Sequence, residues 1–209
     1  MKRFLLTFIL LILVCSSANP YSFTLKKDAD TFVQKEEYQT LSDEANIFYA
    51  QNNINEAQNI IVSIPEEERS AQNWLLLGNI LQDKGKSSDA VFMYQKALQV
   101  DNKCYKAHYN IGNIYLQEDK PNMAVEEYIK ATKIKPDFPY AYYNLGCAYI
   151  KLEKYSKARF ALLDAIDLKN NVPEFHYNLA YVYKMMNKEK SAKIYLEFYN
   201  KLIENNTNF

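Results

Sequence analysis

Two ten-residue segments of this chain are nearly the same: AHYNIGNIYL at 107–116 and AYYNLGCAYI at 141–150, 34 positions apart. The match extends well beyond them. Four blocks of 34 residues, numbered 1 to 4 below, align without a gap at 71–104, 105–138, 139–172 and 173–206. A period of this length is typical of repeat architectures, in which each repeat is a small unit that stacks on the next.

The spacing of apolar and small residues within a block predicts two helices. Block positions 4, 7, 8 and 11 form one face of an amphipathic helix, and positions 20, 24 and 27 mark a second one. Position 8 is small in every block, which indicates that another helix crosses there closely. The residues at this position are Gly78, Gly112, Gly146 and Ala180. Turn-prone stretches such as EDKPN (118–122) separate the two helices. Each block is therefore expected to be a helical hairpin that must stack on its neighbours.

Over residues 71–206 the chain closely resembles the tetratricopeptide repeat family, whose W-L-G-Y…A-F-A…P pattern recurs every 34 residues. A fifth, degenerate copy runs through about 38–70, where Pro65 and the acidic residues after it end the second helix early. We interpret residues 19–37 as a polar tether. The resemblance implies an all-α, right-handed solenoid of stacked helical hairpins. It also implies a concave groove, lined by the first helix of each repeat, that binds another protein.

The first 18 residues have the composition of an export signal. Lys2 and Arg3 precede the apolar run FLLTFILLILV (4–14), and the small residues CSSA follow. The run is short for a membrane span, which needs about 20 residues. Three outcomes remain open: acylation of Cys15 as in a bacterial lipoprotein, cleavage after Ala18, or an uncleaved membrane anchor. We expect an exported protein of the bacterial cell envelope, either membrane-anchored or periplasmic.

Export would permit disulfides, so Cys104 and Cys147 have to be considered. In the repeat register the two residues lie at levels roughly 13 Å apart along the helical rise. A disulfide needs Cα atoms within about 7 Å of each other. Both side chains are therefore expected to be free thiols, buried or half-buried.

The sequence contains no constellation of reactive groups typical of an enzyme, a metal site or a cofactor site. The two histidines, His108 and His176, occupy block position 4, which Trp74 fills in block 1, so we interpret both as packing residues. Phosphate-binding loops, HExxH and CxxC are absent from the sequence. Because Lys+Arg and Asp+Glu both number 25, there is no basic excess to attract nucleic acid. We expect a non-catalytic chain without a cofactor, whose partner is another protein.

The resemblance assigns block positions 2, 5, 6, 9, 12 and 13 to the groove, and tyrosine and asparagine recur at 5, 6 and 9. The candidate binding residues are Asn79, Tyr109, Asn110, Asn113, Tyr143, Asn144, Tyr177, Asn178 and Tyr181. Tyrosine offers apolar area with a hydroxyl, and asparagine offers a donor and an acceptor for a peptide backbone. The alternative is that both residue types simply suit the seam between helices. Chaperone-binding members of the family hold a terminal carboxylate with cations, but Tyr109, Glu174 and Asn178 occupy those positions here. That function is not expected.

The second helix of block 4, KSAKIYLEFYNKLIE (190–204), carries more apolar residues than one buried stripe requires. Tyr199 stands where the other blocks have alanine, so the solenoid is not expected to continue past this helix. The sequence therefore predicts self-association or partner docking through an end interface of Tyr195, Phe198 and Leu202.

The leading hypothesis is a non-catalytic interaction scaffold of the cell envelope that binds an extended peptide segment in the groove lined by tyrosine and asparagine. One alternative is a structural module that assembles with itself or builds a complex through its C-terminal helix. Another is an accessory subunit of an envelope enzyme system.

Overall fold

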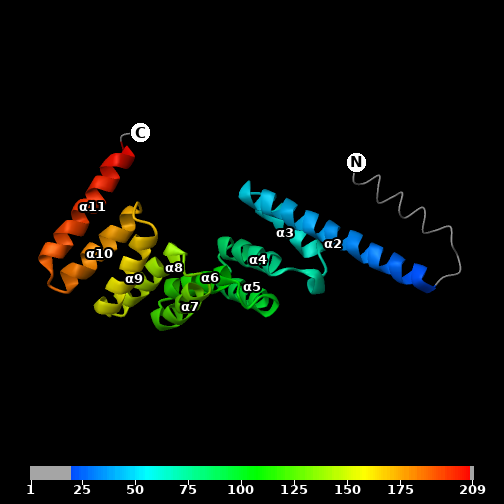
Figure 1. Ribbon diagram of the computed structural model, residues 1–209, viewed down its shortest axis with the longest axis horizontal. Helices are drawn as coiled ribbons and strands as arrows, with labels where there is room; N and C mark the ends of the chain where they lie inside the picture. Colours follow the sequence, from blue (N-terminus) through cyan, green and yellow to red (C-terminus); the bar gives the residue numbers. More distant parts are fainter. Residues whose placement is uncertain (1–19, 208–209) are drawn as a thin grey trace. The chain divides into compact units, whose positions relative to one another are not determined.

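The computed structural model describes residues 20–207, which contain ten α-helices, one short 3₁₀ helix and no strand (Figure 1). The all-α class expected from the repeat period is confirmed. The export signal expected over 1–18, with Cys15, lies outside the described residues. The chain forms two compact units. The first ends at Arg69 and the second begins at Ser70.

The first unit is a long helix paired with a short one. Helix α2 runs over Pro20–Ala50, α3 over Ile54–Ser63, and the 3₁₀ helix η1 over Glu66–Glu68. Ala45 on α2 and Ala57, Ile61 and Ile64 on or beside α3 are fully buried, as the degenerate repeat requires. Helix α3 ends just before Pro65, as predicted.

The polar tether expected over 19–37 is helical from Pro20 on, because α2 already begins there. After Pro20, the sequence of α2 contains neither glycine nor proline, so neither residue breaks this helix before Ala50. The side chains of residues 31–37 are all exposed, so this part of α2 buries no apolar stripe. A helix of this kind shows no amphipathic period, and a reading that depends on periodicity misses it.

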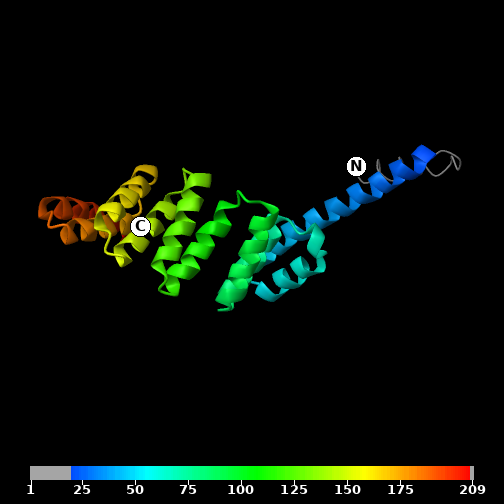
Figure 2. The same cartoon turned by 90° about the horizontal axis from the view of Figure 1, so that it is seen from below.

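The second unit consists of four helical hairpins in a row (Figure 2). The first helices are α4 (Ala71–Asp83), α6 (Tyr105–Gln117), α8 (Pro139–Lys151) and α10 (Pro173–Met185). The second helices are α5 (Ser87–Val100), α7 (Pro121–Ile134), α9 (Tyr155–Leu168) and α11 (Glu189–Thr207). Each pair falls within one 34-residue block, except that α11 runs one residue beyond block 4. Ser70 begins the row as the N-cap of α4, with its Oγ accepting from Asn73 N.

The turn inside each hairpin repeats the same backbone geometry. Block position 15 has a positive φ in every block, at Gly85, Asp119, Glu153 and Asn187. The next residue donates its N–H to a carbonyl five residues earlier, for example Lys120 N to Tyr115 O at 2.8 Å. This is the Schellman motif that ends helices at a left-handed residue. Only one of the four turns uses glycine, so the glycine signal alone would have found one turn.

The small residue at position 8 does accommodate a close helix crossing. A Cβ added to Gly112 would lie 2.7 Å from Cε1 of Tyr128, and one added to Gly146 would lie 2.7 Å from Cγ of Leu162. Tyr94 approaches Gly78 in the same way. The side chain at position 24 of the second helix therefore rests on the bare backbone of the first helix in the same hairpin, as predicted.

Both histidines are packing residues, as predicted, and a side chain of the second helix covers each one. His108 Nδ1 lies 2.6 Å from Glu127 Oε2. His176 is buried, and its Nε2 donates to the carbonyl of Asn170 at 2.7 Å. Trp74, at the same position of block 1, has Lys96 Nζ 5.7 Å from its ring centre. Cys104 and Cys147 are free and half-buried, also as predicted.

The contact between His108 and Glu127 should make stability depend on pH. Burial raises the pKa of Glu127, but hydrogen bonds from His108 and Lys130 outweigh it and lower this pKa below the ordinary 4.5. Because the pKa of Glu127 is lower in the folded chain, its carboxylate stabilises the fold at pH values above the ordinary pKa. This stabilisation is lost as the pH falls through the pKa of the folded state. Glu127→Gln is expected to reduce the free energy of unfolding by about 1 kcal/mol at pH 6 and by much less at pH 3.

Urea denaturation at the two pH values measures this difference. Glu126→Gln is the matched control, because Glu126 is the exposed neighbour of Glu127 on the same helix. Equal losses at both pH values for Glu127→Gln would contradict the role assigned to its charge.

Candidate functional site

The groove expected from the family resemblance is the surface formed by α4, α6, α8 and α10. Neighbouring first helices run parallel. Lys151 at the end of α8 pairs with Asp119 just after α6, at 2.7 Å, and Tyr140 at the start of α8 contacts Phe175 at the start of α10. Equivalent positions of successive blocks therefore lie side by side along this surface.

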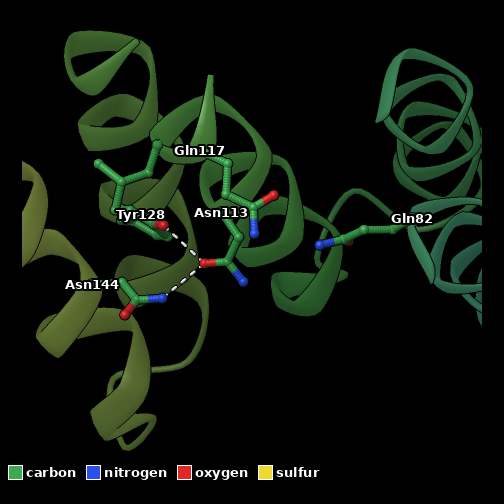
Figure 3. A pocket seen from close by; sticks show the side chains of 6 residues that line it. Gln82, Asn113, Gln117, Tyr128 and Asn144 are labelled. Carbon is green, nitrogen blue, oxygen red and sulfur yellow. Dashed lines mark hydrogen bonds between the residues drawn. The ribbon is translucent and has the colours of Figure 1, made fainter. Parts of the chain in front are cut away.

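The asparagines of the groove are joined to one another across the repeats. Asn113 Oδ1 accepts two hydrogen bonds, one from the hydroxyl of Tyr128 at 2.8 Å and one from Nδ2 of Asn144 at 2.7 Å (Figure 3). Asn144 Nδ2 also donates to the hydroxyl of Tyr109 at 3.2 Å. One side chain of α8 thus holds two side chains of α6.

The same link recurs at the other junctions. Asn110 Nδ2 donates to Asn79 Oδ1 at 2.9 Å, and Tyr94 also donates to that oxygen. At the last junction Asn178 Nδ2 donates to the hydroxyl of Tyr143 at 3.0 Å and contacts Cys147 Sγ at 3.3 Å. Position 6 of blocks 2 to 4 therefore binds position 9 of the preceding block, and in blocks 3 and 4 it also binds the tyrosine at position 5. A sulfur replaces the amide oxygen at the last junction.

These bonds determine what the asparagines can offer a ligand. Each oxygen has two lone pairs, so Oδ1 of Asn79 and of Asn113 is already fully used. Asn110, Asn144 and Asn178 spend amide hydrogens on the preceding repeat, but their Oδ1 atoms accept no hydrogen bond from other residues in 20–207. The seam interpretation therefore accounts for the amide groups, while one acceptor per repeat remains for a backbone N–H.

A pocket of about 270 Å³ opens on this surface where α4, α6, α7 and α8 meet. Its lining residues are Gln82, Asn113, Leu116, Gln117, Tyr128 and Asn144. Four of the six carry carboxamides and none carries a charge. Gln82 and Gln117 were not among the sequence candidates. They occupy block positions 12 and 13, which the resemblance assigns to the groove, but no residue type recurs at these positions to single them out.

Aromatic rings run along the edge of the groove where the first helices begin. The rings in contact are Tyr105, Tyr109, Phe138, Tyr140, Tyr143 and Phe175. Tyr143 stacks on Phe175 with ring centres 4.7 Å apart, and Tyr109 meets Phe138 edge-on at 5.1 Å. Phe138 and Phe175 were missed in the sequence because they lie outside block positions 5, 6 and 9.

The groove tyrosines differ in burial. Burial raises the pKa of Tyr109 and of Tyr143 above the ordinary value, so both hydroxyls stay protonated at neutral pH. Tyr177 and Tyr181 on α10 are exposed to 51% and 41%. The first pair is built into the junctions between repeats, and the second pair presents open ring surface.

The residues predicted as an end interface have mixed surroundings. The ring of Tyr195 stacks on Tyr183, with centres 5.4 Å apart, and on His176. Phe198 also contacts His176 and is 50% exposed, and Leu202 is half-buried. Tyr195 therefore serves mainly to close its own hairpin, and Phe198 presents the open part of this face.

Within 20–207, three or more histidine, cysteine, aspartate or glutamate side chains never come together as a metal site would require. None of the helices in this range is long and apolar enough to cross a membrane.

Comparisons with known proteins agree with this architecture. The family model of the tetratricopeptide repeat protein 21 C-terminal ARM domain matches residues 38–161. No curated protein matches the chain.

Solved structures of MamA have a similar fold. One MamA crystal structure is 19% identical with a TM-score of 0.71, covering 79% of this chain and 97% of that one. MamA from Desulfovibrio magneticus RS-1, from residue 41 to its end, is 20% identical with a TM-score of 0.71, covering 80% of this chain and 96% of that one. Likeness at this identity shows the fold alone.

Proposed function

The chain belongs to the family of the tetratricopeptide repeat protein 21 C-terminal ARM domain, and from this we propose that it is a non-catalytic scaffold that binds an extended segment of another protein in its groove. A solenoid of helical hairpins offers a long surface that several residues of an extended chain can contact at once. The proposal depends on one observation, the carboxamide groups and tyrosine rings that recur along α4, α6, α8 and α10 around an uncharged pocket.

The spacing of the free acceptors suits an extended backbone. Asn110, Asn144 and Asn178 each keep an Oδ1 that accepts no hydrogen bond within the described part of the chain. Packed helices lie about 8–10 Å apart, and three residues of extended, polyproline-like peptide span roughly 9 Å. One backbone N–H in three could therefore reach one of these oxygens.

The chemistry of the surface favours an uncharged peptide. Glutamine and asparagine line the pocket beside Gln117, and tyrosine rings line the edge of the groove. Lys151, a charged residue at the rim, is already paired with Asp119. A peptide with small, aromatic or amide side chains would lose little hydration energy here, whereas a buried charge would have no partner.

Selection from a library of random linear peptides displayed on phage tests this proposal, with fluorescence anisotropy to measure the affinity of the peptides selected. Gln117→Ala is expected to weaken binding about five- to tenfold, because a ligand donor or acceptor then loses its partner. The side chain of Gln117 is exposed and makes no hydrogen bond within residues 20–207, so the melting temperature should not change.

Gln99→Ala is the matched control. It makes the same chemical change at an exposed position of α5, a second helix. Equal affinity of the wild-type chain and Gln117→Ala for every selected peptide would exclude this pocket from binding, and failure to select any linear peptide would refute the groove proposal itself.

We further propose that the chain acts in a bacterial cell envelope after export, attached through Cys15 or released by cleavage after Ala18. The basis is the basic, apolar and small-residue order of residues 1–18. Mass spectrometry of the mature N-terminus is the test. An acylated Cys15 would establish a lipoprotein, Asn19 at the N-terminus would establish cleavage, and an intact Met1 in a cytoplasmic fraction would refute export.

A further inference from the structure

The last hairpin exposes residues that the other hairpins bury. Block position 24 is fully buried in the first three hairpins, as Tyr94, Tyr128 and Leu162, but its counterpart Leu196 on α11 is 42% exposed. The exposed Tyr177 and Tyr181 lie on α10 at positions 5 and 9. These residues share a pocket of about 650 Å³ between α10 and α11. We call it the end pocket.

The equivalent surface of each earlier hairpin is covered by the first helix of the next one. On hairpin 3, Ala158 and Leu162 of α9 pack in one cluster with Phe175, Leu179 and Val182 of α10. On hairpin 2, Ala124 and Tyr128 of α7 pack with Leu145 and Ala148 of α8. The end pocket is lined by the same block positions, including Ala180, Ala192 and Leu196. The end pocket therefore has the shape of a packing site for one further helix, which we call a seat.

The helices that fill the earlier seats show what such a helix must carry. In α8 the residues facing the preceding hairpin are Ala141, Asn144, Leu145 and Ala148, and in α10 they are Phe175, Asn178, Leu179 and Val182. The common pattern is an apolar residue at i, i+4 and i+7 with asparagine at i+3. In the chain that asparagine donates to the tyrosine at position 5 of the preceding block, and Tyr177 occupies that position in the end pocket.

Charge distinguishes the end pocket from the earlier seats. It is lined by Lys184, Lys190 and Lys193 against one carboxylate, Glu189. Within residues 20–207, these lysines form one ion pair, between Lys193 and Glu197 at 4.0 Å with both side chains exposed. A helix parallel to α10 would bring its C-terminal end toward Lys184, and a helix C-terminus carries partial negative charge. Acidic side chains on that half of the helix would add to the attraction.

Polar residues at the far edge of the seat differ from those of a continuing solenoid. Positions 25 and 28 are Leu163 and Ile166 on α9 but Glu197 and Asn200 on α11. The apolar contact area is therefore smaller than at an internal junction. The described helices that fit the pattern, α6, α8 and α10, already have their apolar faces buried in their own unit. A second copy could supply them only by unfolding.

We propose that the end pocket receives an amphipathic helix of another protein, with apolar residues at i, i+4 and i+7, asparagine at i+3 and acidic residues in its C-terminal half. This surface shares Tyr177 and Tyr181 with the last repeat of the groove, but its other lining residues lie apart from the pocket at Gln117, so the two can be tested separately. The helix would complete the stack as α10 completes hairpin 3, with its asparagine donating to Tyr177 and its carboxylates facing the lysines.

The test uses the full chain and two synthetic helical peptides of about 18 residues, long enough for appreciable helicity. Both carry Ala-x-x-Asn-Leu-x-x-Ala, and the C-terminal half carries glutamate in one and lysine in the other. Anisotropy is expected to show at least tenfold tighter binding of the glutamate peptide. Leu196→Glu should weaken that binding at least tenfold, and Lys190→Glu with Lys193→Glu should reverse the preference between the two peptides.

Two controls separate this surface from others. Phe160→Glu places the same charge at an exposed apolar position of α9 and should leave binding unchanged. Gln117→Ala should also leave it unchanged, so the peptide groove and the end pocket can fail independently. The proposal is overturned if neither peptide binds at millimolar concentration or if Leu196→Glu binds as the wild type does. It is also overturned if sedimentation of the chain alone shows a dimer that Leu196→Glu dissociates, because a second copy would then occupy the pocket.

Discussion

Tyr128→Ala is expected to reduce the free energy of unfolding of the second unit by about 3–5 kcal/mol, the usual range for removing a large buried aromatic ring. Tyr128 is fully buried. Its ring lies against the backbone of α6 at Gly112, and its hydroxyl donates to Asn113, which also accepts from Asn144 of α8. The substitution removes packing inside one hairpin and weakens the junction with the next.

Tyr128→Phe separates these two contributions. It keeps the ring and removes the hydrogen bond, so it should cost about 0.5–1.5 kcal/mol. Urea denaturation gives both values, and amide hydrogen exchange gives the location of the loss. Because hairpins in a solenoid contact only their neighbours, the loss of protection should concentrate in α6, α7 and α8. A cost below about 1.5 kcal/mol for Tyr128→Ala would show that the ring is not a packing centre.

Gly112→Ala is expected to destabilise the chain although alanine is the better helix former. The exchange should gain about 1 kcal/mol in helix propensity. The new Cβ would lie 2.7 Å from Cε1, 2.9 Å from Cδ1 and 3.0 Å from Cζ of Tyr128. The ring is enclosed and has no room to move, and overpacking of this kind costs about 1–3 kcal/mol. The net result should be a loss of up to about 2 kcal/mol.

A second substitution should rescue this variant. At block positions 8 and 24, hairpin 4 combines Ala180 with Leu196. Gly112→Ala should therefore reduce the free energy of unfolding less in a Tyr128→Leu background than in the wild type. Comparing the unfolding free energies of the wild type, both single variants and the double variant measures the coupling. A Gly112→Ala chain as stable as the wild type would contradict the close crossing inferred here.

The repeat period made most of the second unit predictable. A gapless spacing of 34 residues determined the number of hairpins, the positions of their helices and the small residue at position 8, because these depend on local periodicity. The packing role of His108 and His176 followed from their alignment with Trp74. The recurrence of tyrosine and asparagine singled out side chains that the structure joins across the repeats, such as Tyr109 and Asn144.

The remaining features depend on contacts between repeats, which periodicity does not report. The packing of α8 on α6 decides whether the side chain of Asn144 faces a ligand or faces Asn113. In the structure, its Nδ2 donates to Asn113 Oδ1 at 2.7 Å. The seating also brings Gln82 and Gln117 to one pocket from different hairpins. The N-terminal part of α2 was missed for the opposite reason, since it is helical without an apolar face.

The asparagine links on the groove side give the second unit an uneven response to bending. Opening the groove would lengthen the bonds between Asn79 and Asn110 and between Asn113 and Asn144, whereas closing it would not. Hydrogen bonds weaken steeply when stretched, so widening meets resistance at each junction. The junction between α4 and α6 has the fewest of these links, because Asn110 donates to Asn79 alone and position 5 of block 1 is Leu75, which has no hydroxyl. Under tension along the row, this is where the solenoid should yield first.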